Sequence, residues 1–274
     1  MFTDVILDML GWIFECITGL TADGSGFTVG LPDFNNGLYT WSITILHNVA
    51  MPVAMVILSL FMMLEMYHAA LKAQNSGSSI PAEIIFKILI RMALAKLAID
   101  SIELIMLAIF SISTYLTEQI AGLVTSGTAG TFDLETLKPS VQALDFGSQV
   151  VTMIVALIVY LITMIASLYA QVLVVTRFIQ IYLYLAVSPI PTATLLDDQH
   201  SAIGKGFLKS FGAVCLQGTL LYLVMTFFPV IMVNAIQITD NVTSALWSVA
   251  GYSFVLLFAL SGTGKWASKI TGDA

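Results

Sequence analysis

The residues best placed to do chemistry are three charged side chains in an apolar run between positions 85 and 114. Lys96, Asp100 and Glu103 fall within an arc of about 60° on a helical period. Charges at membrane depth are costly and usually face protein or water, so this polar face indicates a proton or ion relay, as in a secondary transporter of a small solute. The alternative is structural: Lys96 and Asp100 lie one turn apart and neutralise each other, while Glu103 pairs with another helix.

Other reactive residue types do not form a recognisable site. His47 has no second His nearby and no HExxH motif, so a hydrogen-bonded helix-packing role is favoured over metal ligation. Cys16 and Cys215 form no CxxC pair, which argues against zinc and redox chemistry. No GxSxG motif is present. We therefore expect no catalytic, cofactor or metal site, and we expect a protein that is not an enzyme.

The elements that carry these residues must be membrane helices. Of 274 residues, 58% are hydrophobic and 10% charged, and the mean hydropathy is +0.94. Soluble domains are about a quarter charged, so the composition predicts an all-α, polytopic membrane protein. The net charge of −7 argues against a generally basic nucleic-acid-binding surface.

Five apolar runs are long enough to cross a bilayer, which requires about 20 residues each. The predicted transmembrane helices lie at about 41–66, 85–114, 149–190, 208–236 and 244–262. The third run carries one charge, Arg177, and would measure about 63 Å as a single helix. It is therefore one overlong helix or a hairpin that adds a sixth span, and a re-entrant segment over 172–190 is a further alternative.

The distribution of basic residues favours one crossing for the third run and sets the orientation. Basic residues concentrate in cytoplasmic segments of membrane proteins. If 149–190 crosses once, the basic clusters fall on one side and the acidic segments 1–40 and 115–148 on the other. The prediction is an amino terminus outside and a carboxyl terminus inside. The basic residues concerned are Lys72, Lys87, Arg91, Lys205, Lys209, Lys265 and Lys269.

The domain organisation follows from these spans. Residues 1–40 form an outward-facing amphipathic helix and loop, and residues 41–266 form the transmembrane bundle. Within the bundle, 115–148 is an outward loop and 191–207 a cytoplasmic loop, and 267–274 is a cytoplasmic tail. Close helix contacts are expected at small residues, namely Ala166, Ala170, Gly212, Ala213 and Gly218. Pro52 and Pro229 predict helix kinks.

The first 20 residues have an acidic stripe on an otherwise apolar helical pattern. Asp4, Asp8 and Glu15 lie within an arc of about 80°, and Trp12 belongs to the apolar remainder. Three carboxylates make a poor spanning segment. We expect this helix to lie at the membrane surface and to pack between protomers, with a first spanning helix as the alternative.

The segment 188–209 is the most distinctive polar stretch among the predicted cytoplasmic regions. Pro189 and Pro191 should stop the third helix, and Asp197 and Asp198 supply a turn before Lys205. This connection is either a docking site for a soluble partner or a plain linker.

Taken together, these features resemble a known family. The five-span layout, the outward amphipathic helix, the central outward loop, and the run SPIPTATL followed by GKGFLKSFGAVCLQG are similar to TrbL-type conjugal transfer proteins, especially those of Gram-positive conjugative elements. These are polytopic cytoplasmic-membrane subunits of bacterial type IV secretion systems.

The resemblance implies a non-enzymatic channel or scaffold subunit that forms a homo-oligomer within membrane lipid. It would contact other secretion-channel membrane subunits and a cytoplasmic secretion ATPase, and it would help to pass single-stranded DNA with its relaxase across the membrane. Residues 188–195 and 204–207 would lie on the ATPase side, and 115–148 would be the loop expected to contact substrate. One Lys against four acidic residues in that loop is a weak DNA footprint and favours an indirect contact.

Overall fold

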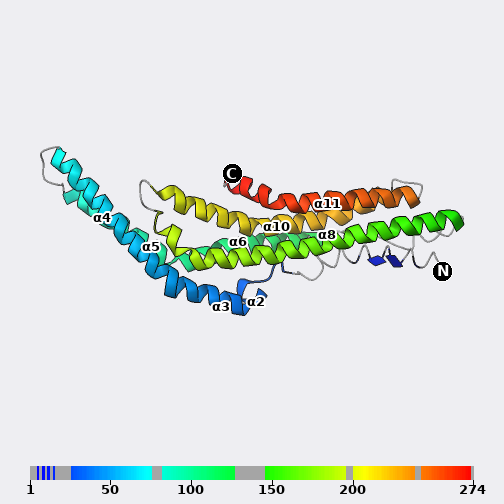
Figure 1. The fold of residues 1–274 in the computed structure, drawn as a ribbon, viewed down its shortest axis with the longest axis horizontal. Coiled ribbons are helices and arrows are strands. Elements are labelled where there is room, and N and C mark those ends of the chain that lie inside the picture. The colour runs from blue at the N-terminus through cyan, green and yellow to red at the C-terminus, as the bar shows by residue number, and fades with distance from the viewer. Residues whose placement is uncertain are drawn as a thin grey trace. The chain divides into compact units, whose positions relative to one another are not determined.

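The computed structural model describes residues 26–75, 82–126, 146–195, 200–237 and 242–272, together with Val5, Asp8, Met9, Gly11, Trp12 and Glu15. In these residues all regular secondary structure is helical (Figure 1). The helices are α2 (Leu31–Phe34), α3 (Asn36–Ile45), the π-helical turn η1 (Leu46–Ala50), α4 (Met51–Asn75), α5 (Ala82–Asp100), α6 (Ile102–Ser126), α8 (Phe146–Val187), α9 (Pro189–Thr192), α10 (Ser201–Gln237) and α11 (Val242–Thr271).

Five helical stretches of the described chain are long and apolar enough to cross a membrane. They are Asn36–Gln74, Ile102–Leu123, Gly147–Val187, Ser201–Ile231 and Trp247–Thr271. The first stretch joins α3, η1 and α4 without a break. The prediction of an all-α polytopic membrane protein is confirmed.

The ambiguous third run is one uninterrupted helix. Helix α8 extends over 42 residues from Phe146 to Val187. It ends there because Pro189 and Pro191 lack the N–H groups that would continue the hydrogen-bond ladder, although Ser188 itself keeps helical backbone angles. The hairpin reading of 149–190 is therefore wrong.

Several predicted boundaries differ from the structure. The span expected over 85–114 is divided at Ser101 into α5 and α6, and the candidate span on this part of the chain begins at Ile102. Parts of the predicted loops are helical, namely 115–126 and 146–148 of the outward loop and 201–207 of the cytoplasmic loop. The reason is that polarity alone does not end a helix: Glu118, Gln119 and Ala121, for example, are good helix formers.

The chain divides into two compact units. The first unit comprises Met1–Val29, Ser113–Arg177 and Leu216–Ala267, as far as these ranges are described, and the second comprises Gly30–Ile112, Phe178–Cys215 and Ser268–Ala274. Parts of α6, α8, α10 and α11 belong to each unit.

The first unit packs helices through small and hydroxyl-bearing residues. Ala166 in α8 is completely buried, and the Thr163 hydroxyl of the same helix lies 3.3 Å from the Ser253 hydroxyl of α11. Between α10 and α6, the Thr219 hydroxyl lies 2.9 Å from that of Thr117. Small residues let helix backbones approach closely, and hydroxyls then bond across the gap.

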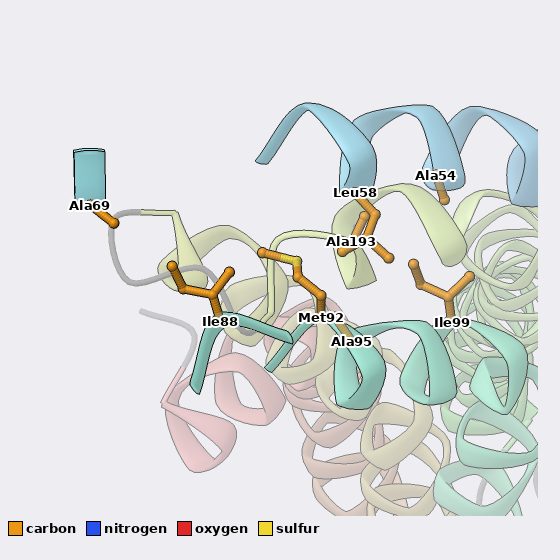
Figure 2. Packing of buried hydrophobic residues seen from close by; sticks show 8 residues of the cluster. All are labelled: Ala54, Leu58, Ala69, Ile88, Met92, Ala95, Ile99 and Ala193. Atoms are coloured by element: carbon orange, nitrogen blue, oxygen red, sulfur yellow. The ribbon is translucent and has the colours of Figure 1, made fainter. Parts of the chain in front are cut away.

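The second unit is built on the hairpin of α4 and α5, which lie side by side in Figure 1. Buried apolar residues of both helices form a cluster along their seam, and α9 contacts both helices. Figure 2 shows the buried cluster, in which Ala193, just after α9, joins residues of the hairpin. Its members are Ala54, Leu58, Ala69, Ile88, Met92, Ala95, Ile99 and Ala193.

Helix α2, which lies just before the first candidate span, contacts the C-terminal part of α8 within the same unit. The rings of Phe34 and Phe178 stack at 3.8 Å between centroids with an interplanar angle of 6°. The Tyr182 hydroxyl donates to the Leu31 carbonyl at 2.6 Å. Asn35 caps α3 by accepting from the Leu38 N–H at 3.0 Å.

Candidate functional site

A π-helical turn interrupts the first candidate span at the position of His47. In η1 the N–H of Met51 donates to the carbonyl of Leu46, five residues earlier, where an α-helix would use the residue four earlier. Pro52 follows directly and has no N–H to contribute to the ladder, so the backbone must adjust here. Single π turns are rare and often mark functional sites.

The side chain of His47 extends from this turn and contacts α6. Its Nε2 lies 2.9 Å from Oε2 of Glu103, and the two side chains are 46% and 31% exposed. Glu103 also acts electrostatically on Tyr39 of α3. His47 and Glu103 thus contact each other from different helices, and the packing role predicted for His47 stays a prediction.

The other two members of the predicted polar face pair with each other. Lys96 Nζ donates to Asp100 Oδ2 at 2.6 Å, as expected for residues one helical turn apart. Both side chains are about half exposed, and both precede the candidate span that starts at Ile102. The three charges therefore form two separate contacts, and the closed site that a solute transporter would need is not formed by them.

A third ion pair crosses the hairpin. Arg91 Nη1 donates to Glu65 Oε1 at 2.7 Å, and the side chains are 23% and 14% exposed. This pair was not among the predicted contacts. The sequence did contain a signal for this pair. In an antiparallel hairpin, facing residues lie equally far from the middle of the connection, and Glu65 and Arg91 are equally far from position 78, between α4 and α5.

The segment predicted to dock a partner is partly packed inside the second unit. Pro189 is buried and Pro191 half-buried, whereas Lys205 is exposed in the first turns of α10. A Cβ on Gly204 would lie 2.8 Å from the Pro191 carbonyl oxygen, so the glycine permits close packing of α10 on this turn. Asp197 and Asp198 lie outside the described residues.

The N-terminal helix is described at a few positions. Asp8 and Glu15 are helical and exposed. Trp12 is 60% exposed, with its ring centroid 6.1 Å from that of Tyr160 in α8. Asp4 lies outside the described residues.

One buried charge of the first unit was not anticipated. Arg177 is 1% exposed, and its guanidinium group fills the space that a side chain at Gly218 of α10 would occupy. The sequence predicts close packing at Gly218 and marks Arg177 as the one charge of the third run, but nothing in their spacing connects the two residues. A charge that ends an apolar run and one that is buried by a facing glycine look the same in a single sequence.

The contacts described above and the candidate spans indicate what kind of protein this chain is. Within the described ranges, no group of three or more His, Cys, Asp and Glu side chains could hold a metal ion. The ionisable side chains of His47, Glu103, Arg91 and Glu65 instead join helices of a multi-pass membrane protein.

The family of the chain follows from its sequence. Residues 27–189 match the family described as TrbL/VirB6 plasmid conjugal transfer like protein, which covers more than half of the chain. The chain belongs to this family and is a conjugal transfer subunit of the type IV secretion class. No curated protein and no solved structure matches the chain. The matched residues run from just before α2 to the first residue of α9.

Proposed function

We propose that this chain is a channel or scaffold subunit of a conjugative type IV secretion system that supports transfer of single-stranded DNA with its relaxase across the bacterial cytoplasmic membrane. It catalyses no reaction itself. The family match over residues 27–189 carries the proposal, because it spans all of α3 to α8 and so includes each ion pair described above.

The amino terminus lies outside and the carboxyl terminus inside in this proposal. Seven of the ten Lys and Arg residues belong to the second unit, which supports a cytoplasmic position for much of it. Lys209 Nζ donates to the Gly272 carbonyl at 3.1 Å, so the start of α10 and the end of α11 lie together. Their basic residues therefore belong on one side of the membrane.

The partners in this proposal are further copies of the chain, other membrane subunits and a cytoplasmic ATPase. Exposure of Asp8, Trp12 and Glu15 supports a role for the N-terminal helix between protomers. Lys205 is exposed, which supports an ATPase contact at this residue. We propose that Asp197 and Asp198, which lie outside the described residues, belong to the same contact. Pro189 is buried, so Pro189 and Pro191 contribute by shaping the connection. Contact with DNA is indirect.

The test is transfer from a donor cell that lacks the gene in frame. Deletion should abolish transfer of the element, and the wild-type gene supplied elsewhere should restore it. Asp100→Asn should restore it equally well, because Asp100 contributes to an exposed local pair. The proposal fails if the deletion strain transfers normally. It also fails if the isolated protein takes up a solute in a proton- or sodium-dependent way that Asp100→Asn abolishes.

A further inference from the structure

We propose that His47 and Glu103 form a proton-binding site that fastens the π turn of the first candidate span to the start of α6 and loosens as the pH rises. The site consists of one imidazole and one carboxylate 2.9 Å apart, contributed by residues that are 56 positions apart in sequence. This inference concerns the protein's own response to protons and does not rest on the proposed function.

The chemistry of the pair makes its strength depend on protonation. Histidine changes its charge between about pH 5 and 8. When the imidazole is protonated, the contact is a charge-assisted hydrogen bond between opposite charges; after the proton has left to water, a neutral imidazole faces the carboxylate. The neutral imidazole can still donate to the carboxylate, but the attraction between opposite charges is lost. The contribution of the contact is therefore largest where the carboxylate is ionised and the imidazole protonated, and it falls as the pH rises through the range in which histidine loses its proton.

The titratable groups near His47 and Glu103 contribute no net charge of their own near neutral pH. On α3, Tyr39 interacts electrostatically with Glu103, and a tyrosine side chain carries no charge near neutral pH. On α5, Lys96 and Asp100 neutralise each other at 2.6 Å. Helix α9 contacts η1 but has no titratable side chain, and neither does α4 between Met51 and Leu64. A proton on His47 therefore takes the immediate site from one net negative charge to none.

The backbone at this position explains why the contact between His47 and Glu103 matters for the structure. The π turn and Pro52 weaken the helical ladder at this point of an otherwise continuous run from α3 to α4. The bond to Glu103 ties this weak point to a regular helix. Loss of the proton should therefore loosen the joint between α3 and α4 while the rest of the second unit stays packed.

A double-mutant cycle on the full-length purified protein tests the proposal. The variants are His47→Gln, Glu103→Gln and the double variant, and the readout is the thermal unfolding midpoint at pH 6 and pH 8. The coupling between the two substitutions should raise the midpoint by about 2–4 °C at pH 6, the shift expected for a pair of this kind in a chain of this size. At pH 8 it should be less than half as large. Other histidines cancel from the cycle.

Two controls keep the result interpretable. The same cycle with Lys96→Gln and Asp100→Asn should give equal coupling at both pH values, because neither group is expected to change charge in this range. His47→Lys keeps a positive charge throughout and should couple to Glu103 equally at pH 6 and pH 8. A His47–Glu103 coupling that is not larger at pH 6 than at pH 8 overturns the proposal, as does a His47→Lys coupling that falls between them.

Discussion

The two units of this protein join their helices with different chemistry. Among the described residues of the first unit, neutral hydroxyls make polar contacts between helices, as between Thr163 and Ser253. Among those of the second unit, two ion pairs join helices, namely Arg91 with Glu65 across the hairpin and His47 with Glu103, while a further pair, Lys96 with Asp100, lies within α5. The first unit also buries a single arginine against a glycine.

The difference follows from the cost of charge in an apolar setting. A hydroxyl can bond to its own helix backbone and to a neighbour, so it is inexpensive to bury, whereas an ionised group must be neutralised or reach water. The side chains of the three pairs in the second unit are 14% to 56% exposed, consistent with partial access to polar surroundings. The comparison predicts that the largest effects come from tightly enclosed contacts and the smallest from exposed ones.

The enclosed Arg177 should be the most sensitive point. Gly218→Ala places a methyl group inside the position of the guanidinium group, so either the arginine or α10 must move. We expect a loss of about 3 kcal/mol in the free energy of unfolding, at the upper end for overpacking. The matched control is Gly251→Ala in α11, where an added Cβ meets no atom within 4 Å. Unfolding in denaturing detergent compares the two, and equal effects would refute the assignment.

The pair across the hairpin should rank next. Glu65→Gln removes the carboxylate charge that accepts from Arg91 at 2.7 Å, and we expect a loss of about 2 kcal/mol, less than for a fully buried pair because both side chains retain some exposure. Glu83→Gln, at an exposed position of the same hairpin, is the control and should have little effect. A loss for Glu83→Gln as large as for Glu65→Gln would show that the ion pair does not stabilise the hairpin.

The hydroxyl contacts of the first unit should contribute less per residue. Thr219→Val keeps the shape of the side chain but removes bonds to α6 at 2.9 Å and 3.2 Å. We expect about 1 kcal/mol, in the range measured for side-chain hydrogen bonds between membrane helices. Thr226→Val should cost less, because the Thr226 hydroxyl donates to Tyr222 in its own helix. The reverse order in the unfolding experiment would contradict the account of the first unit.

The exposed pair on α5 should matter least to stability. A double-mutant cycle on Lys96 and Asp100 should give a coupling below about 0.5 kcal/mol that shrinks further in high salt, because surrounding water and ions screen the pair. A coupling above 1 kcal/mol, or one insensitive to salt, would place this pair in a more enclosed environment than its exposure indicates.

Sequence reasoning reached the parts of the fold that depend on composition and local order. Charge asymmetry favoured one long third helix, and α8 is continuous to Val187, where the prolines end it. The division between α5 and α6 at Ser101 was not predictable, because no helix-breaking residue marks it. The π turn at His47 was also missed: Pro52 predicted a kink but not its form.

The polar contacts divide in the same way. The pair of Lys96 and Asp100 follows from helical spacing alone and was anticipated. Glu103 was expected to find a partner, but its identity depends on how α6 packs against η1, which a single sequence does not encode locally. The contact of Arg177 with Gly218 required knowledge of the register between α8 and α10.

The most direct test of the account links its packing to transfer. Donor cells lacking the gene receive either Gly218→Leu or Gly251→Leu, matched for expression, and the frequency of transfer of the element is measured. The account predicts that Gly218→Leu behaves like the deletion, because the side chain displaces Arg177, whereas Gly251→Leu transfers like the wild type. Normal transfer by the Gly218→Leu donor would contradict it.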